Sequence, residues 1–188
     1  MKLLIYLVVF FQFFDGFKAN RVTTDSLIRD ACKKASKYAD PHYYKFCIAC
    51  ISENPESKNV KNIDELIMVG VKIAIANMTN LKGIVEKILK ERKYKSKLTG
   101  KLLRDCVKLY SEGNDSLTKS LEYLKLRDYM KVSTKIDNVK AIPRVCEMGF
   151  NDDNKQKSPV KNENDVLYDV IDMAQYFNYN AHLEPPPM

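Results

Sequence analysis

The chain has 188 residues, of which 31 are Lys or Arg and 24 are Asp or Glu, so its formal net charge is +7. This length suits one domain that buries a sizeable core, and a hydrophobic content of 45% argues against a disordered chain. The lysines are spread among acidic residues, without a basic stripe that alternates with aromatic residues. This pattern argues against nucleic-acid binding and favours an acidic partner, such as cell-wall pectin or an acidic protein.

The N-terminus has the pattern of a secretory signal peptide. An uninterrupted apolar run from Leu3 to Phe11 follows Lys2. It is too short to cross the ~30 Å hydrocarbon core of a bilayer, and Ala19 is a suitable last residue before cleavage. We therefore predict a signal peptide over residues 1–19, a mature domain over residues 20–183 and a disordered tail over residues 184–188. The mature protein is expected to be secreted without a membrane anchor; an uncleaved N-terminal anchor is the alternative.

The next segment has the pattern of a short helical hairpin. Only six glycines and seven prolines interrupt the chain, which favours long helices joined by few loops. A first helical pattern covers residues 23–39. A second runs to Ile51 and is expected to begin with Asp40 as its N-cap and Pro41 at the first helical position.

Four longer amphipathic patterns follow. The strongest runs from about Asn62 to Arg92, and the next begins near Ser96 and is expected to continue through Gly113 as one helix. A third begins at Asp128, and a fourth covers residues 165–177 after a polar loop over residues 151–164. Within the third, Pro143 predicts a kink or an early end. The apolar faces of these last three helices are predicted to include Leu98, Val145 and Val166.

These patterns together predict the fold class. No segment alternates apolar and polar residues convincingly, so no strand is predicted. The expected fold is all-α: an up-and-down four-helix bundle with an N-terminal α-helical hairpin, cross-linked by two disulfides.

Five cysteines lie in the predicted mature chain, and a secreted chain oxidises its thiols. Two disulfides and one free thiol can form in 5 × 3 = 15 ways, so counting alone does not assign them. A Cys32–Cys47 bridge would close the hairpin, and a Cys106–Cys146 bridge would join two bundle helices, with stabilisations of about 3 and about 4 kcal/mol. This pairing leaves Cys50 as a free thiol, expected to be a small buried residue on the inner face of the hairpin. A Cys47–Cys50 redox pair is the alternative, although it would span a single helical turn and no strand precedes it.

The sequence offers little for catalysis or metal binding. His42 and His182 do not stand at metal-ligand spacing from a cysteine pair, and His182 lies beside the predicted tail. We find no Ser-His-Asp or Cys-His arrangement, no glycine-rich phosphate loop and no carboxylate pair in apolar surroundings. We therefore expect a protein that is not an enzyme and that binds no metal and no cofactor. Two N-glycosylation sequons begin at Asn77 and Asn114, and Asn114 is the better candidate because Asn77 flanks an apolar helix face.

Several motifs around the cysteines resemble those of a known family. These are "ACKKASKYADPHYYKFC", "DCVKLY" and "VCEMGF", with "SPV" shortly after the last. They resemble the plant invertase and pectin methylesterase inhibitor family, most nearly its branch of plane-tree pollen allergen-like invertase inhibitors, over about Asp25 to Leu183. The resemblance implies a secreted four-helix bundle with an N-terminal hairpin, no cofactor and no catalysis. It also implies the disulfide pairing favoured above, with Cys50 free.

The resemblance further implies a protein inhibitor that blocks the active-site cleft of a plant cell-wall or vacuolar invertase, or of a pectin methylesterase, in the apoplast or the vacuole. Invertase inhibitors of known type carry a Pro-Lys-Phe triplet after a Gly-Asp pair. The corresponding candidate contact here is Asp128, Tyr129, Met130 and Lys131, of which only Asp128 matches. A helix N-cap followed by a surface tyrosine is the simpler interpretation. The rival function is a secreted, non-inhibitory binding protein for a small apolar ligand or a non-enzyme partner.

Overall fold

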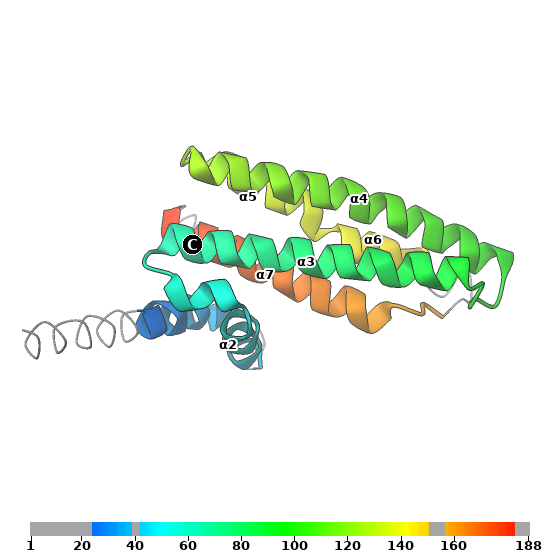
Figure 1. Ribbon diagram of the computed structural model, residues 1–188, viewed down its shortest axis with the longest axis horizontal. Helices are drawn as coiled ribbons and strands as arrows, with labels where there is room; N and C mark the ends of the chain where they lie inside the picture. The colour runs from blue at the N-terminus through cyan, green and yellow to red at the C-terminus, as the bar shows by residue number, and fades with distance from the viewer. Residues whose placement is uncertain (1–23, 39–41, 151–156, 183–188) are drawn as a thin grey trace, which may run out of the picture.

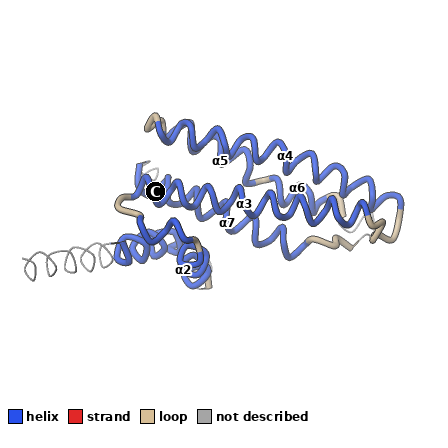
Figure 2. Tube along the Cα trace, in the orientation of Figure 1, coloured by secondary structure: helices blue, strands red, loops and turns tan. Residues whose placement is uncertain are grey.

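The computed structural model describes residues 24–38, 42–150 and 157–182. The predicted signal peptide and the predicted tail lie outside these ranges. Every regular element in the described ranges is helical, which confirms the all-α prediction (Figure 2). After a first helix over residues 24–35, the elements are η1 (Ser36–Tyr38), α2 (Tyr43–Glu53), η2 (Pro55–Asn59), α3 (Ile63–Lys90), α4 (Lys97–Lys125), α5 (Tyr129–Lys140), α6 (Ile142–Met148) and α7 (Lys161–His182).

The long helices form the expected up-and-down bundle. α3, α4, the pair α5 and α6, and α7 each run opposite to the helix before them (Figure 1). The turn between α3 and α4 and the start of α7 lie at one end, which we call the α3–α4 end. The turn between α4 and α5 and the C-terminus of α7 lie at the other, the α4–α5 end. The hairpin of the first helix and α2 packs beside α3 and α7, nearer the α4–α5 end.

The starts of the long helices follow from local capping. The side chain of Asn62 accepts a hydrogen bond of 3.0 Å from the Glu65 N–H, and Ser96 accepts one of 3.0 Å from the Thr99 N–H. The predicted start of the second hairpin helix is wrong. α2 begins at Tyr43 with His42 at its N-cap position and no side-chain cap, while Asp40 and Pro41 lie outside the described residues. At this start the Tyr43 ring packs edge-on against Tyr176 of α7 at 6.2 Å.

α4 continues through Gly113, as the sequence predicted. A Cβ atom at this position would lie 2.6 Å from Met78 Sδ and 2.9 Å from Ile142 Cδ1. The glycine therefore costs some helix propensity but lets α3 and α6 approach α4 closely.

The break near Pro143 separates α5 from α6. Pro143 sits in the first turn of α6, where its missing N–H is tolerated. The buried stripe of α5 continues across the break through Pro143 and Cys146, and Val145 lies beside this stripe and is 48% exposed. The prediction of Val145 as a core residue is therefore wrong.

Two further apolar-face predictions are wrong by one helical position. Leu98 is 38% exposed in the first turn of α4, beside the buried Thr99. Val166 is 45% exposed and lies beside the inward stripe of α7, which runs from Asn164 to Leu167 and onward. Residues at the border of an apolar arc are the ones that a periodicity argument places least well.

Both favoured disulfides are present. Cys32 is bonded to Cys47 with a Cα–Cα distance of 5.7 Å, and Cys106 to Cys146 with a Cα–Cα distance of 5.2 Å. Cys50 is free and half-buried rather than fully buried. Burial, followed by the nearby carboxylates of Glu53 and Asp169, raises the pKa of its thiol to about 11.

Candidate functional site

The candidate contact residues lie at the α4–α5 turn. α4 ends with Arg127 in the left-handed region, at φ 56°, and the Asp128 N–H donates to the Tyr123 carbonyl at 3.0 Å. This is a Schellman-type helix end, in which the left-handed residue is usually glycine. Because Arg127 occupies that position, the sequence did not predict this helix end. It leaves the Leu126 side chain 75% exposed at the tip of the bundle.

Asp128 caps α5, as predicted. Its carboxylate accepts a hydrogen bond of 3.2 Å from the Lys131 N–H and pairs with Lys131 Nζ at 2.7 Å. The side-chain bond, followed by the backbone bond, lowers the pKa of Asp128, and the same partner raises the pKa of Lys131. Both groups are therefore charged near neutral pH. Asp128 therefore stabilises the start of α5, because both of its contacts lie within the first turn of this helix.

Tyr129 is a bridging residue between three helices. Its ring stacks on the imidazole of His182 at 3.5 Å with an interplanar angle of 6°, and its hydroxyl donates to Asp64 Oδ2 at 3.1 Å. Asp64 Oδ1 lies 2.6 Å from His182 Nε2, and the Asn178 amide donates to the Tyr129 carbonyl at 3.1 Å. Partial burial and the Asp64 carboxylate raise the pKa of Tyr129. Tyr129 is half-buried, so the simpler interpretation of a surface tyrosine is incomplete: this ring also joins α3, α5 and α7.

His182 shows where sequence reasoning missed a partner. We placed it beside a loose tail, but it is the last residue of α7 and its side chain is only 17% exposed. No local pattern links it to Asp64, which is 118 positions away in the sequence. Only the antiparallel packing of the bundle brings the two side chains together.

Met130 and Lys131 face solvent instead. Met130 is 65% exposed, and Lys131 Nζ lies 5.3 Å from the ring centre of Tyr123. Together with Leu126 they form an exposed surface, which we call the turn surface: Leu126, Met130 and Lys131. The structure thus divides the four predicted contact residues. Asp128 and Tyr129 hold the turn in place, and Met130 and Lys131 are available to a partner.

A buried polar network anchors the second disulfide at the α3–α4 end. The Tyr110 hydroxyl lies 2.8 Å from Asn164 Oδ1 and 3.2 Å from Cys146 Sγ. The Asn164 amide donates to Glu147 Oε1 at 2.6 Å, and the Ser158 hydroxyl donates to the same oxygen at 2.7 Å. Burial raises the pKa of Tyr110 far above its usual range. The network therefore ties α4 and α6 to the start of α7.

The predicted glycosylation asparagines are half-buried at the contact between α3 and α4. Asn77 Nδ2 donates to the Ile73 carbonyl at 2.9 Å, and Asn114 Nδ2 donates to the Thr79 hydroxyl at 3.0 Å. Thr79 belongs to the other sequon, so the two sequons meet across the helix pair. Modification at either position stays a prediction, and a glycan on Asn114 would replace its bond to Thr79.

Among the described residues, no group of three or more His, Cys, Asp or Glu side chains is arranged to bind a metal ion. In the same ranges, none of the helices is both long enough and apolar enough to span a bilayer.

Comparison with known proteins assigns the chain to a family. The model of the plant invertase/pectin methylesterase inhibitor family matches residues 26–176. The chain is 36% identical over 171 residues to "Pectinesterase inhibitor 12" of Arabidopsis thaliana, covering 91% of this chain and 94% of that protein. It is 26% identical over 164 residues to a Platanus acerifolia protein named "Putative invertase inhibitor", covering 87% and 89%.

A third relative is "Cell wall / vacuolar inhibitor of fructosidase 2" of Arabidopsis thaliana. It is 28% identical over 131 residues, covering 68% of this chain and 66% of that protein. All three relatives are named as inhibitors, which agrees with the expectation that this protein is not an enzyme. The chain belongs to the plant invertase/pectin methylesterase inhibitor family.

Proposed function

We propose that this protein is a secreted inhibitor of a pectin methylesterase, which it blocks by covering the active-site cleft as a rigid helical plug. Family membership supports an inhibitor of pectinesterase or invertase, and the choice between the two targets is the proposal. The observation that carries it is the position of Tyr129. This residue stands where the known invertase inhibitors have their triplet, yet its ring is held against His182 and its hydroxyl against Asp64.

A side chain with these contacts is poorly suited to enter a substrate pocket. To reach outward, Tyr129 would have to give up its stacking on His182 and its bond to Asp64, and would leave both groups with one partner fewer. The relative of 36% identity that is named as a pectinesterase inhibitor supports the same choice. The turn surface remains free to contact the target, with two apolar side chains and one cation.

Rigidity is what such a plug needs. Association loses less free energy when the binding surface is already ordered. The contacts of Tyr129 with α3 and α7 and the Asp128 cap order the α4–α5 end that carries the turn surface, while the two disulfides cross-link the hairpin and the other end of the bundle. Secretion belongs to the same proposal, with the apoplast as the destination and the vacuole as the alternative. N-terminal sequencing of the secreted protein should begin at residue 20.

The rival proposal of an apolar-ligand binder receives less support. A groove that opens among the described residues at the α3–α4 end is lined by many Lys, Arg, Asp and Glu side chains. Charged side chains of this kind favour a polar ligand over an apolar one.

The test is inhibition of purified pectin methylesterase and, in parallel, of purified plant acid invertase by the oxidised secreted protein at mildly acidic pH. We expect stoichiometric loss of the esterase activity and none of the invertase activity. Loss of invertase activity alone would overturn the proposed target. If neither enzyme activity is lost, the protein has the fold of the family but binds a different partner.

A matched pair of variants tests the turn surface. M130A/K131A should weaken esterase inhibition about tenfold, because exposed anchors at the centre of an interface contribute more than about 1 kcal/mol. Met148→Ala is the control, because Met148 is 67% exposed, as Met130 is 65% exposed, but lies on α6. Equal inhibition by M130A/K131A and the unchanged protein would remove the turn surface from the interface.

A further inference from the structure

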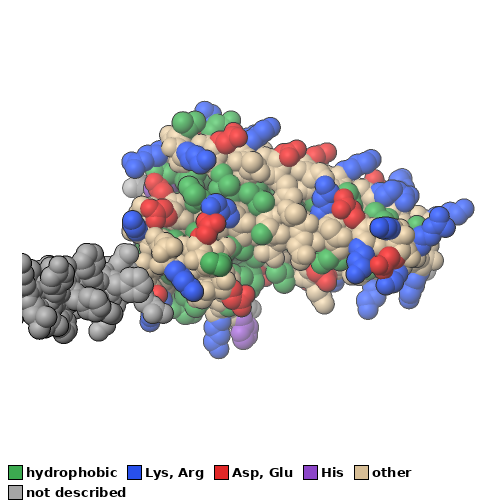
Figure 3. Space-filling view, viewed as in Figure 1, with side chains coloured by type: hydrophobic (Ala, Val, Ile, Leu, Met, Phe, Trp, Pro, Cys, Tyr) green, Lys and Arg blue, Asp and Glu red, His purple; other side chains and the backbone are tan. Residues whose placement is uncertain are grey.

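The net positive charge of the protein is concentrated at the α3–α4 end. Residues 87–101 contain seven Lys or Arg residues and one Glu, a net of +6 within a chain of net +7. The sequence suggested that the lysines were spread among acidic residues, and over this segment that interpretation is wrong. In the space-filling view the Lys and Arg side chains gather around the end of the molecule that lies away from the hairpin (Figure 3).

This accumulation is electrostatically unfavourable for the fold itself. Lys97 is the first residue of α4 and Lys101 follows one turn later, while the first turn of the helix has no acidic residue. Cations at a helix N-terminus oppose the helix dipole. Among the described residues, neither Lys95 nor Lys97 has an ion-pair partner, and Lys93 pairs only with the exposed Glu91 at 2.6 Å. An anionic partner would relieve this repulsion.

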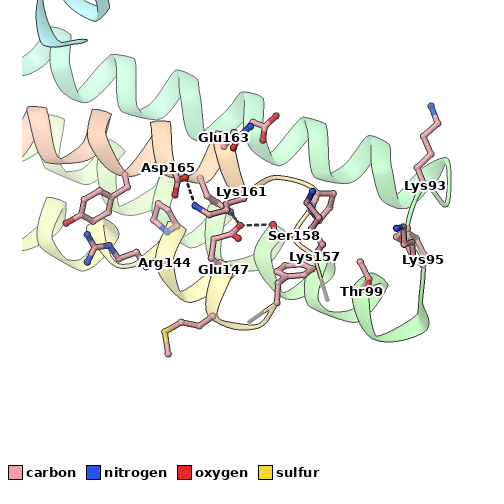
Figure 4. Close-up of a pocket in the computed structure, with 18 of the residues that line it drawn as sticks. Lys93, Lys95, Thr99, Arg144, Glu147, Lys157, Ser158, Lys161, Glu163 and Asp165 are labelled. Atoms are coloured by element: carbon pink, nitrogen blue, oxygen red, sulfur yellow. Dashed lines mark hydrogen bonds and ion pairs between the residues drawn. The ribbon is translucent and has the colours of Figure 1, made fainter. Parts of the chain in front are cut away.

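A groove of about 1440 Å³ opens beside this segment. Five cations line it from three parts of the chain that are far apart in the sequence: Lys93 and Lys95 from the α3–α4 turn, Arg144 from α6, and Lys157 and Lys161 at the start of α7. Figure 4 shows Lys93 and Lys95 at one end of the groove, Arg144 at the other and Lys157 and Lys161 between them. The positive charges are thus distributed along its length, which suits an extended polyanion better than a single small anion.

Aromatic and acidic side chains complete the lining. Tyr94 lies at the Lys93 end, where a Cβ atom on Gly100 would come within 2.7 Å of its ring, so the glycine makes room for the tyrosine. At the other end the Arg144 guanidinium stacks over the Tyr168 ring at 4.0 Å. Four carboxylates also line the groove, those of Glu147, Glu163, Asp165 and Asp169. Asp165 pairs with Lys161 at 2.6 Å (Figure 4). Flat rings fit the faces of sugars, and carboxylates accept hydrogen bonds from hydroxyl groups.

This combination distinguishes between classes of polyanion. Duplex nucleic acid carries a high density of phosphate charge, which the acidic side chains in the groove would repel. A polysaccharide of uronic acids carries its charges farther apart than duplex nucleic acid does, so the acidic side chains repel it less. It offers carboxylates to Lys93, Lys95 and Lys157, hydroxyl groups to Glu163 and a sugar face to Tyr94, while Lys161 stays paired with Asp165 and Arg144 covers Tyr168. We propose that this groove binds a linear carboxylated polysaccharide, with unesterified polygalacturonate as the ligand to test.

The binding site is separate from the turn surface, which lies at the opposite end of the bundle (Figure 1). A protein that inhibits a wall enzyme through one end can therefore be held on an anionic wall polymer through the other. The two activities do not depend on each other in this arrangement.

The test is equilibrium binding of the full secreted protein to polygalacturonate across a range of salt concentrations. We expect binding that weakens as salt increases, little binding to the same polymer after full methyl esterification, and weaker binding to duplex DNA at equal anion concentration. Equal binding to the methyl-esterified polymer would overturn the proposal, because the cations would then have no role. Tighter binding to DNA would also overturn it and would indicate a phosphate polyanion.

Charge-matched variants locate the site. K93Q/K95Q/K157Q should lower the affinity for polygalacturonate about tenfold and make its salt dependence shallower, since three exposed ion pairs are lost. K33Q/K34Q/K58Q removes the same charge from exposed lysines of the hairpin and of η2, and should bind as the unchanged protein does. Equal weakening by both variants would mean that net charge alone is responsible and would overturn the groove assignment.

The outcome is distinguishable from that of the inhibition assay. A protein that inhibits pectin methylesterase but does not bind polygalacturonate would contradict this inference alone. A protein that binds polygalacturonate but does not inhibit the esterase would contradict only the proposed function.

Discussion

The hairpin and the bundle are held together by different means. The bundle buries large side chains along its length, and Phe177, Leu117 and Met78 are each at most 1% exposed. The hairpin has a smaller core around its disulfide, and hydrogen bonds between described residues attach it to the rest. The Thr24 hydroxyl donates to the Val60 carbonyl at 2.8 Å, and the Tyr43 hydroxyl donates to the Asp169 carbonyl at 3.2 Å.

The comparison shows what a cross-link contributes when apolar burial is limited. A segment of about thirty residues cannot bury enough apolar surface to fold alone, so it depends on a disulfide and on docking to a larger unit. The bundle has enough apolar burial to be stable, and there the disulfide is part of a polar network. The experiments below, taken from the largest expected effect to the smallest, test this difference.

The largest effect is expected for Phe177→Ala in the bundle. Removing this 1% exposed ring should lower the free energy of unfolding by about 3–5 kcal/mol, because the cavity cannot close fully in a packed core. Urea denaturation measures the change. Leu126→Ala, at a side chain that is 75% exposed, is the control and should stay within about 0.5 kcal/mol. A loss below about 1 kcal/mol for Phe177→Ala would mean that the bundle core is not the main source of stability.

The next effect is expected for C32A/C47A in the hairpin. Opening the loop between positions 15 apart in the sequence should cost about 3 kcal/mol. Hydrogen exchange should show faster exchange in the first helix and α2 than in α3 and α7. Cys50→Ala is the control, because Cys50 is outside the disulfide. Uniform loosening of hairpin and bundle would contradict the separation of the two regions.

A smaller effect is expected for Tyr110→Phe beside the second disulfide. The substitution leaves Asn164 Oδ1 without its 2.8 Å partner in a residue that is 1% exposed, which should cost about 1–3 kcal/mol. Thermal unfolding measures the loss. Tyr123→Phe removes a hydroxyl from the half-buried Tyr123 on the same helix and should have little effect. If the two variants were equally stable, the polar network around Cys146 would contribute no stability beyond that of the disulfide.

The smallest effect concerns the reactivity of Cys50. With its pKa raised to about 11 from 9.0, the folded protein has about a hundredfold less thiolate below pH 9, and the greater nucleophilicity of a more basic thiolate recovers about tenfold. Alkylation at pH 8 should therefore be about tenfold slower than in the urea-unfolded chain. Equal rates would mean that the hairpin does not shield the thiol.

The same shift has a consequence for stability. Because the folded pKa lies above the unfolded value, the neutral thiol stabilises the fold fully below about pH 9, and this contribution is lost as the pH rises to about 11. The pH dependence of urea denaturation for Cys50→Ala against the unchanged protein measures it. The difference between the two should shrink or change sign over that interval. A constant difference would contradict the assigned cause.

Much of the fold could be predicted because its signals are local. Asn62, Ser96 and Asp128 cap the helices that they were expected to begin, and Pro143 marks the break between α5 and α6. Capping and periodicity act over a few residues, so a single sequence contains them. The start of α2 and the exposure of Val145 were not predicted, because the first is not marked by a local cap and the second lies at the border of the apolar stripe, where packing decides which residue is covered.

By itself the sequence determined the helices, the chemistry that pairs four of the five cysteines, and the likeness to a family of inhibitors. Only the tertiary structure decided what the candidate residues do. It turned Tyr129 inward onto His182 and Asp64, left Met130 and Lys131 outside, and brought Lys157, Lys161 and Arg144 into line with the cations of the α3–α4 turn. The reason is physical: a cap or an apolar stripe needs neighbours within one or two turns, whereas a partner more than a hundred residues away is chosen by how the helices pack.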